Sequence, residues 1–307
     1  MFNIALLSSK SFAPHAAATI VSVLENNKDL KFNILIFTID FDESTVEKFK
    51  QIESKYQSEI SVIKLTNDDI SIVPQIGRWG FYALGRLVII KLLSEKYDSV
   101  LILGADTIIQ GSIKEVFELD MTNYAFAGAD DMDNCIKHKE RLGLPAESIY
   151  SNLDFYLINF KFWREKNINE KVFLYVQNNF NKIQVGDQDV INVICNGYIK
   201  ELPITYNMQS PYYYHKPQIL EKHLVGLELV KKNPIVIHFS EYVKPWNYEC
   251  KHPLRVKYWY YQNMTPWRNM RKSFWSKRPY LHIPKMELLY ILHYFNIKKT
   301  NNLYDKL

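Results

Sequence analysis

The first feature of this chain that could carry chemistry is an acidic residue just beyond the end of an apolar run. Residues 99–103 read Ser-Val-Leu-Ile-Leu, and Asp106 follows them after Gly104 and Ala105. The apolar run predicts a buried strand. Open α/β sheets bind ligands outside the carboxyl ends of their strands, so a carboxylate at this point is a candidate member of a binding site.

Alternating strand and helix patterns must position this carboxylate. In the first hundred residues, apolar strands alternate with segments of helical spacing, which predicts right-handed βαβ units and a mainly parallel sheet in an α/β fold. The expected strands are residues 2–7, 31–38, 59–65, 99–103, 125–129, 154–160 and 235–239. The expected helices are residues 14–25, 42–56, 80–93, 170–180 and 188–194.

Composition excludes several classes of protein. The chain has 307 residues, 47% of them hydrophobic, which is enough for a full core and excludes wholesale disorder. The net charge is +5, and no run of Lys and Arg in the first 240 residues resembles a phosphate-binding stripe, which argues against a nucleic-acid partner. Cys135, Cys195 and Cys250 are far apart, which favours free thiols over a disulfide framework or a zinc site.

Two further observations predict a cytoplasmic protein. No window approaches the ~20 apolar residues that a membrane-spanning helix needs. The apolar N-terminal run, residues 1–7, lacks the basic segment of a signal peptide and is expected to be a strand instead.

Short segments that contain small and polar residues follow one another along the chain. They are Ala13-Pro14, Arg86, Gly104-Ala105-Asp106, Asn152-Leu153-Asp154, Asn159, Gly186-Asp187-Gln188-Asp189, residues 202–207 and residues 238–246. Taken in this order they resemble glycosyltransferase family 8, and within it the bacterial lipopolysaccharide galactosyl- and glucosyltransferases. The resemblance covers roughly residues 1–268.

This resemblance implies a GT-A fold, which is Rossmann-like, and a nucleotide-diphosphate sugar donor with UDP as the expected nucleotide. It also implies a Mn2+ or Mg2+ ion and retention of the anomeric configuration. The expected reaction is transfer of a hexose to a bacterial surface glycan or lipid-linked acceptor, as in lipopolysaccharide or capsule synthesis. Negative charge develops on the departing diphosphate, and a divalent cation with fixed cationic side chains would stabilise it.

The resemblance also assigns roles to individual residues. Asp106 and His238 are the expected metal ligands. Asp187 and Gln188 are the expected catalytic residues, with Gln188 near the anomeric carbon. The expected contacts to the donor come from Ser9, Arg86, Asp106, Asn152, Asp154 and Lys244.

Ordinary structural roles stay open for the same positions. Asp106 could cap the end of a strand, and His238 could be a satisfied core histidine. Arg86 could be a surface side chain or a salt-bridge partner. Residues 187–189 could form the first turn of a helix, where acidic side chains interact well with the helix dipole.

Four positions depart from the family's pattern. Gly104 stands where the first acid of an Asp-x-Asp motif is expected, which removes one metal ligand. Ser9 stands where an Asp is expected to contact the uracil ring. Asp154 replaces the glycine of an Asn-x-Gly segment, and Glu241 replaces the glycine of a His-x-x-Gly segment. The last two changes add carboxylates near the expected sugar and diphosphate.

Two interpretations of these departures remain. In the first, Asp154 or Glu241 replaces the lost ligand, or the enzyme uses an atypical donor or no metal. In the second, catalysis is impaired and the chain binds a nucleotide sugar or a partner transferase. Loss of a carboxylate greatly weakens a divalent cation site. The other residues with expected metal and donor roles all remain, which favours an active hexosyltransferase.

The chain is expected to consist of a catalytic domain, residues 1–250, and a helical C-terminal extension, residues 251–307. The extension interleaves aromatic with basic residues, and residues 284–297 form an apolar segment. Both features suit a membrane–water interface, which predicts contact with the inner face of the cell membrane through residues 255–297. The alternatives are packing on the main domain or on another subunit, and RNA binding.

Overall fold

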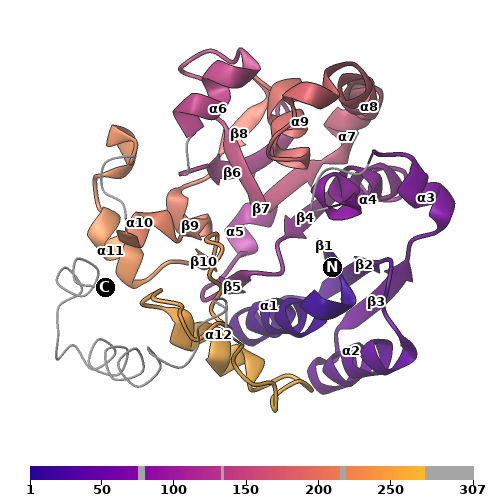
Figure 1. The fold of residues 1–307 in the computed structure, drawn as a ribbon, viewed down its shortest axis with the longest axis vertical. Helices are drawn as coiled ribbons and strands as arrows, with labels where there is room; N and C mark the ends of the chain where they lie inside the picture. Colours follow the sequence, from indigo (N-terminus) through magenta and orange to yellow (C-terminus); the bar gives the residue numbers. More distant parts are fainter. Residues whose placement is uncertain (75–79, 133–134, 215–218, 274–307) are drawn as a thin grey trace.

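The computed structural model describes residues 1–74, 80–132, 135–214 and 219–273 (Figure 1). Within these residues the main element is a seven-stranded sheet in the order β3-β2-β1-β4-β7-β6-β8. Its strands are β1 (Phe2–Leu7), β2 (Phe32–Thr38), β3 (Glu59–Lys64), β4 (Ser99–Leu103), β6 (Phe126–Asp130), β7 (Ser151–Asn159) and β8 (Ile199–Glu201). Strand β7 runs antiparallel to β4 and β6, and the other neighbours are parallel. The expected α/β class with a mainly parallel, mixed sheet is confirmed.

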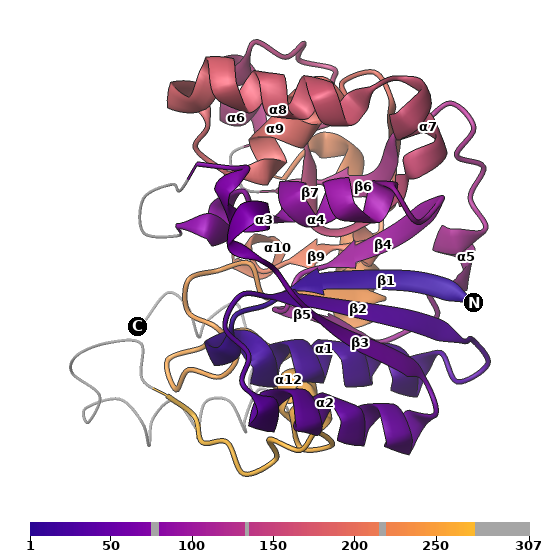
Figure 2. The same ribbon diagram turned by 90° about the vertical axis from the view of Figure 1, so that its right-hand side faces the viewer.

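Both faces of this sheet are apolar, which is why helices cover both. Along β1, Ile4 and Leu6 belong to the core cluster that includes α1 and α2, whereas Ala5 belongs to the cluster on the other face. This alternation follows from the two-residue period of a strand. Figure 2 shows α1 (Ala13–Asn26) and α2 (Glu43–Tyr56) on one face. The opposite face carries α4 (Gly85–Ser94), α7 (Phe160–Glu165), α8 (Ile168–Asn179) and α9 (Asp187–Ile194).

A small second sheet extends from the carboxyl end of β4. It has the order β5-β10-β9 and consists of β5 (Thr107–Ile109), β9 (Met208–Gln209) and β10 (Val236–His238). In the antiparallel pair of β10 and β5, His238 lies opposite Thr107. The amide of Phe239 also donates to the carbonyl of Asp106 at 3.0 Å. This pairing brings His238 next to Asp106 although 131 residues separate them in the sequence. The remaining helices are α3 (Asn67–Ser71), α5 (Lys114–Phe117), α6 (Cys135–Leu142), α10 (Pro211–Tyr214), α11 (Leu227–Lys232) and α12 (Arg255–Gln262).

Most expected elements occur close to their predicted bounds, with differences that have local causes. The helix expected over residues 80–93 begins only at Gly85, because residues 81–83 form a tight 3-10 turn. Strand β7 begins at Ser151 rather than at residue 154. The strands β5, β8 and β9 were not expected, since two or three residues are too few to show a periodic pattern.

The described part of the C-terminal extension packs on the main domain. The Tyr258 hydroxyl lies 2.6 Å from Nδ1 of His15, and Asn26 donates to the Tyr261 hydroxyl at 2.7 Å, so α12 is joined to α1. Trp267 packs against Phe49 of α2. Packing on the main domain, one of the alternatives, therefore holds for these side chains. The division at residue 250 stays a prediction.

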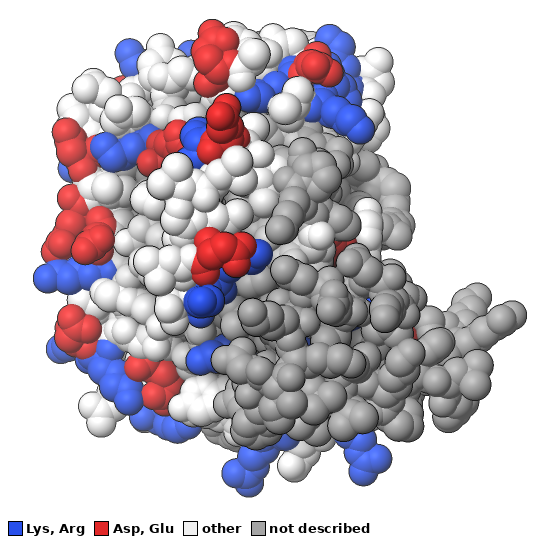
Figure 3. Space-filling view, turned by 90° about the vertical axis from the view of Figure 1, so that its left-hand side faces the viewer, with Lys and Arg blue, Asp and Glu red and all other residues white. Residues whose placement is uncertain are grey.

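The expected membrane contact through residues 255–297 lies partly outside the described residues, which end at 273. In the described ranges, no helix combines the length and the apolar character that crossing a bilayer demands. On the face drawn in Figure 3, acidic and basic side chains lie side by side over the described surface.

Candidate active site

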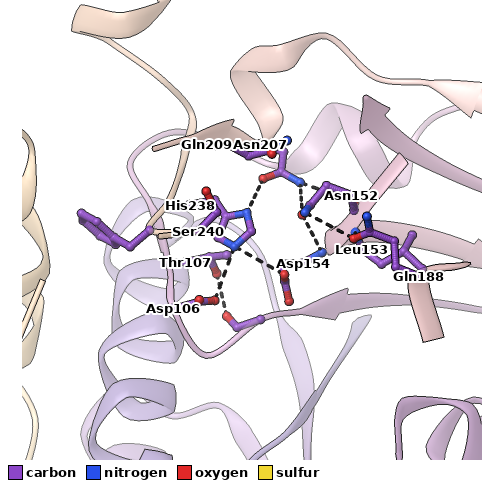
Figure 4. A network of polar contacts seen from close by, with 12 residues as sticks. Asp106, Thr107, Asn152, Leu153, Asp154, Gln188, Asn207, Gln209, His238 and Ser240 are labelled. Carbon is purple, nitrogen blue, oxygen red and sulfur yellow. Dashed lines mark hydrogen bonds and ion pairs between the residues drawn. The ribbon is translucent and has the colours of Figure 1, made fainter. Parts of the chain in front are cut away.

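Three side chains from distant parts of the chain meet at the carboxyl end of β4. Asp106 follows β4, Asp154 lies in β7 and His238 ends β10, and one candidate ligand atom from each lies within 4.8 Å of the others (Figure 4). Nε2 of His238 is 3.7 Å from Oδ1 of Asp106 and 3.4 Å from Oδ2 of Asp154. The neighbouring strands β4 and β7 and the pairing of β10 with β5 produce this convergence.

Each carboxylate in this group uses its other oxygen to bind a cationic side chain. Lys244 donates to Oδ2 of Asp106 at 2.7 Å, and Arg86 donates to Oδ1 of Asp154 at 2.7 Å. Burial by itself would raise the pKa of Asp106, but the ammonium group of Lys244, 2.7 Å from Oδ2, outweighs burial and lowers that pKa to about 2. Oδ1 of Asp106 and Oδ2 of Asp154 are left facing His238.

Two buried amides set the orientation of the His238 ring. Asn207 donates from Nδ2 to Oδ1 of Asn152 at 2.9 Å, which turns its own Oδ1 toward Nδ1 of His238, also at 2.9 Å. An amide oxygen can only accept, so this hydrogen-bond network assigns the proton of a neutral ring to Nδ1. In that neutral form, Nε2 presents its lone pair to the two carboxylates.

These three atoms fit a divalent cation. An imidazole lone pair and two carboxylate oxygens repel one another unless positive charge lies between them. Nitrogen and oxygen ligands of this kind suit Mn2+ and related ions. A histidine that donates its other N–H to a neighbouring acceptor is also the usual arrangement of a metal ligand. Such a cation would supply positive charge close to a departing diphosphate.

A second group of candidate ligands, Asp130, Glu201 and His223, fits a metal less well. Lys222 forms ion pairs with Asp130 and with Glu201. It contacts the same oxygen of Asp130 that lies 3.1 Å from Nε2 of His223. The ammonium group of Lys222 therefore already balances the negative charge of the two carboxylates in this second group.

Arg86 links the Asp106 group to the start of α9. Its Nε lies 2.7 Å from Oδ2 of Asp187, and its Nη2 donates to Oδ1 at 3.0 Å, which makes a two-point ion pair. The start of α9 reaches Arg86 because Gly186, with φ of +61°, lies against the backbone of Ala83. A Cβ atom at Gly186 would be 3.0 Å from the Ala83 carbonyl carbon and nearer still to its oxygen. Arg86 is thus a partly buried salt-bridge partner.

The three polar residues that begin α9 have different surroundings. Gln188 is buried and donates from Nε2 to Asp131, a residue outside the family's motifs. Asp189 is also buried, but it accepts from two backbone amides of the preceding loop at 2.7 and 2.9 Å and from Arg141 at 2.8 Å. Asp189 therefore holds the helix start in place, whereas Asp187 and Gln188 adjoin the Asp106 group.

The remaining expected residues differ in their relation to the site. Asn152 belongs to the buried network, where its side chain contacts Asn207 and Gln188. Ser9 follows β1, the strand beside β4, and its hydroxyl lies 2.9 Å from that of Ser11. Glu241 lies in the loop after β10 and is not a member of the described ligand group that contains Asp154.

Sequence reasoning assigned no role to Asn207 or Asp131. Asn207 does end one of the short segments that carry the family resemblance, residues 202–207, but its contact with His238 depends on the pairing of β9 with β10. Asp131 directly follows β6, so its place at a strand end was the available signal.

Comparison with known proteins decides the family. A sequence model described as glycosyl transferase family 8 matches residues 3–250, well over half of the chain. The chain belongs to glycosyltransferase family 8. The expectation drawn from its ordered motifs is confirmed, and the protein is a glycosyltransferase.

Two similar proteins are named as lipopolysaccharide glycosyltransferases. A lipopolysaccharide 1,2-glucosyltransferase of Escherichia coli is 29% identical over 296 residues, which cover 92% of this chain and 85% of the relative. A lipopolysaccharide 1,3-galactosyltransferase of Salmonella typhimurium is 25% identical over 273 residues, which cover 87% and 79%.

A solved structure agrees in fold. The galactosyltransferase LgtC, in complex with donor and acceptor sugar analogues, matches with a TM-score of 0.74 at 18% identity. The match covers 87% of this glycosyltransferase and 99% of LgtC. The likeness confirms the GT-A fold that the motifs implied.

Proposed function

We propose that this family 8 glycosyltransferase moves a hexose from a UDP-sugar to a lipid-linked or surface glycan during bacterial lipopolysaccharide or capsule synthesis. The observation that carries the proposal is the convergence of Asp106, His238 and Asp154 at the ligand-binding edge of the sheet. The names of the relatives from Escherichia coli and Salmonella typhimurium support the acceptor class. A lipid-linked acceptor also favours a peripheral position at the cytoplasmic face of the membrane.

The divalent ion in this proposal is Mn2+ or Mg2+, and Asp106 and His238 hold it. The ion supplies fixed positive charge at the diphosphate of the donor. Lys244, beside Asp106, adds a second positive charge at the same place. The protein thereby stabilises the charge that develops as the sugar leaves.

The sugar of the donor is expected near the start of α9. Arg86, Asn152 and Asp187 offer charged and polar groups to its hydroxyls. Gln188 is proposed to lie near the anomeric carbon, and it is amide-bearing rather than acidic, so it is no strong nucleophile. The acceptor hydroxyl is then expected to attack the anomeric carbon on the same face that the diphosphate leaves, which retains the anomeric configuration. A phosphate oxygen of the departing diphosphate is expected to take the proton of that hydroxyl.

Thermal unfolding with sugar nucleotides tests this function directly. Each nucleotide sugar of a panel is added with Mn2+ and with EDTA, because a ligand that binds only the folded state raises the melting temperature. We expect one UDP-sugar to stabilise the protein in Mn2+ and not in EDTA. Equal stabilisation in EDTA would contradict the metal, and stabilisation by a different nucleotide would contradict UDP. No stabilisation by any member would favour an impaired, partner-binding protein.

Transfer assays with single variants test the residues. Asp106→Ala, Gln188→Ala and His238→Ala are each expected to abolish transfer while the domain stays folded by circular dichroism. The control is Gln51→Ala, at an exposed position of α2. A variant that transfers at the wild-type rate removes its residue from the proposed site.

A further inference from the structure

Gly104, which directly follows β4, lies across from Asp154 of the neighbouring strand β7. The residues next to them, Leu103 and Phe155, are paired between β4 and β7, and the amide of Gly104 donates to the carbonyl of Asp154 at 2.9 Å. These are two of the four positions at which the sequence departs from the family's pattern. The strand pairing makes them neighbours, although 49 residues lie between them along the chain.

The two positions share one volume. A Cβ atom built on Gly104 would lie 2.8 Å from both Cβ and Cγ of Asp154 and would overlap its Oδ1. Real Cβ atoms essentially never come that close to other heavy atoms. A side chain at residue 104 therefore excludes the present position of the Asp154 carboxyl, and glycine at 104 makes room for it.

The Asp154 carboxyl in this volume points at the candidate cation site. Its Oδ1 is held by Arg86 at 2.7 Å, while Oδ2 faces Nε2 of His238 at 3.4 Å. The side chain is 24% exposed, so it is shielded from water without being sealed off. By holding Oδ1, Arg86 also fixes the rotation of the carboxyl group and leaves Oδ2 to bind a metal ion. This arrangement suits a carboxylate that binds a metal through a single oxygen.

We propose that Asp154 is the third protein ligand of the metal and replaces the acid that is missing at Gly104. Asp and Gly have exchanged places between β4 and β7, so the carboxylate reaches nearly the same point from the opposite strand. The site keeps its anionic charge, on which binding of a hard divalent cation depends. This inference rests on the proposed metal-dependent function, and it excludes Glu241 from the role of replacement ligand.

Direct measurement of Mn2+ binding tests the exchange without an activity assay. The free Mn2+ signal in electron paramagnetic resonance gives the dissociation constant, measured with and without UDP. Asp154→Gly and the isosteric Asp154→Asn are both expected to weaken binding by about 100-fold, because each removes one anionic ligand. Asp29→Gly, at an exposed loop position, is the matched control and is expected to bind as the wild type does.

The reversed exchange is the decisive variant. Gly104→Asp alone is expected to lower the melting temperature, because its Cβ atom would overlap the Asp154 side chain. Gly104→Asp combined with Asp154→Gly is expected to restore Mn2+ affinity to within about tenfold of the wild type. Failure of the double variant to bind better than Asp154→Gly, while both remain folded, would overturn the exchange.

The outcomes also separate this inference from the function on which it rests. If Asp106→Asn weakens Mn2+ binding while both Asp154 variants bind normally, the metal site stands and the role of Asp154 is wrong. If the wild-type chain binds no Mn2+ with or without UDP, the metal-dependent function and the exchange are both wrong.

Discussion

Nδ1 of His238 lies 2.9 Å from Oδ1 of Asn207, and both side chains are buried. This contact fixes which ring nitrogen faces Asp106 and Asp154. Asn207 is not one of the three candidate metal ligands, and it contacts the site through His238 and Asn152, so we regard it as a positioning residue. Its importance can be measured through the properties of His238.

Asn207→Ala is expected to weaken Mn2+ binding by about 10- to 100-fold, the usual effect of losing the partner of a metal-binding histidine. Asn207→Asp keeps an oxygen for Nδ1 and is expected to retain most of the affinity. If the role of Asn207 were purely structural, the two variants would change only the melting temperature and would keep the wild-type dissociation constant for Mn2+. Equal Mn2+ dissociation constants for Asn207→Ala and the wild type would contradict the positioning role.

Arg86→Gln is expected to destabilise the fold by about 3–5 kcal/mol, because it leaves the buried carboxylate of Asp187 without its cation. Adding Asp187→Asn removes that unpaired charge and should recover part of the loss. Lys114→Gln, which breaks an ion pair between half-exposed side chains, is the control and should cost less than about 1 kcal/mol. Urea unfolding of the wild type and the three variants gives their free energies of unfolding. Equal losses of stability for Arg86→Gln and Lys114→Gln would contradict the importance of the buried ion pair.

Gly186→Ala tests how α9 is brought to Arg86. The backbone at Gly186, with φ of +61° and ψ of −134°, lies in a region that residues with a side chain rarely adopt, which costs about 1–3 kcal/mol. The overlap with Ala83 adds about 1–3 kcal/mol. Gly143→Ala is the matched control, because it has φ of +70° but no heavy atom within 4 Å of the added Cβ. Urea unfolding should show a clearly larger loss for Gly186→Ala, and equal losses would mean that close packing at Ala83 is unimportant.

Stability is expected to fall as the pH is lowered from about 6.5 toward 5. Burial lowers the pKa of His15 and of His252 to about 3 in the folded state. In this pH window the unfolded chain binds protons that the folded chain does not, so acid favours unfolding. Each histidine contributes up to about 1.4 kcal/mol per pH unit.

Urea unfolding at pH 7, 6 and 5 in EDTA measures this slope. His15→Gln and His252→Gln should each flatten it, whatever they do to the stability at pH 7. A slope that neither substitution changes would contradict the neutral, buried state of the two rings.

Local patterns in the sequence determined the layers of the fold and the edge at which the site lies. The apolar run over residues 99–103 predicted β4, since a strand buried on both faces has no polar alternation. The same run placed Asp106 at the ligand-binding edge. The order of short motifs predicted the family, because each motif is a property of contiguous residues. The helix expected from residue 80 began late, since a 3-10 turn precedes it and helix bounds depend on such local geometry.

Only the tertiary structure decided which of these groups meet. The sequence showed Gly104, Asp154 and Glu241 as separate departures and left open whether Asp154 or Glu241 faces the site. The register of β4 against β7 makes Gly104 and Asp154 occupants of one volume, and the pairing of β9 with β10 places Asn207 against His238. Contacts between residues far apart in the chain depend on strand register, and a shift of one residue would turn each side chain to the other face. No local pattern specifies that register, so the composition of the site is a property of the folded chain.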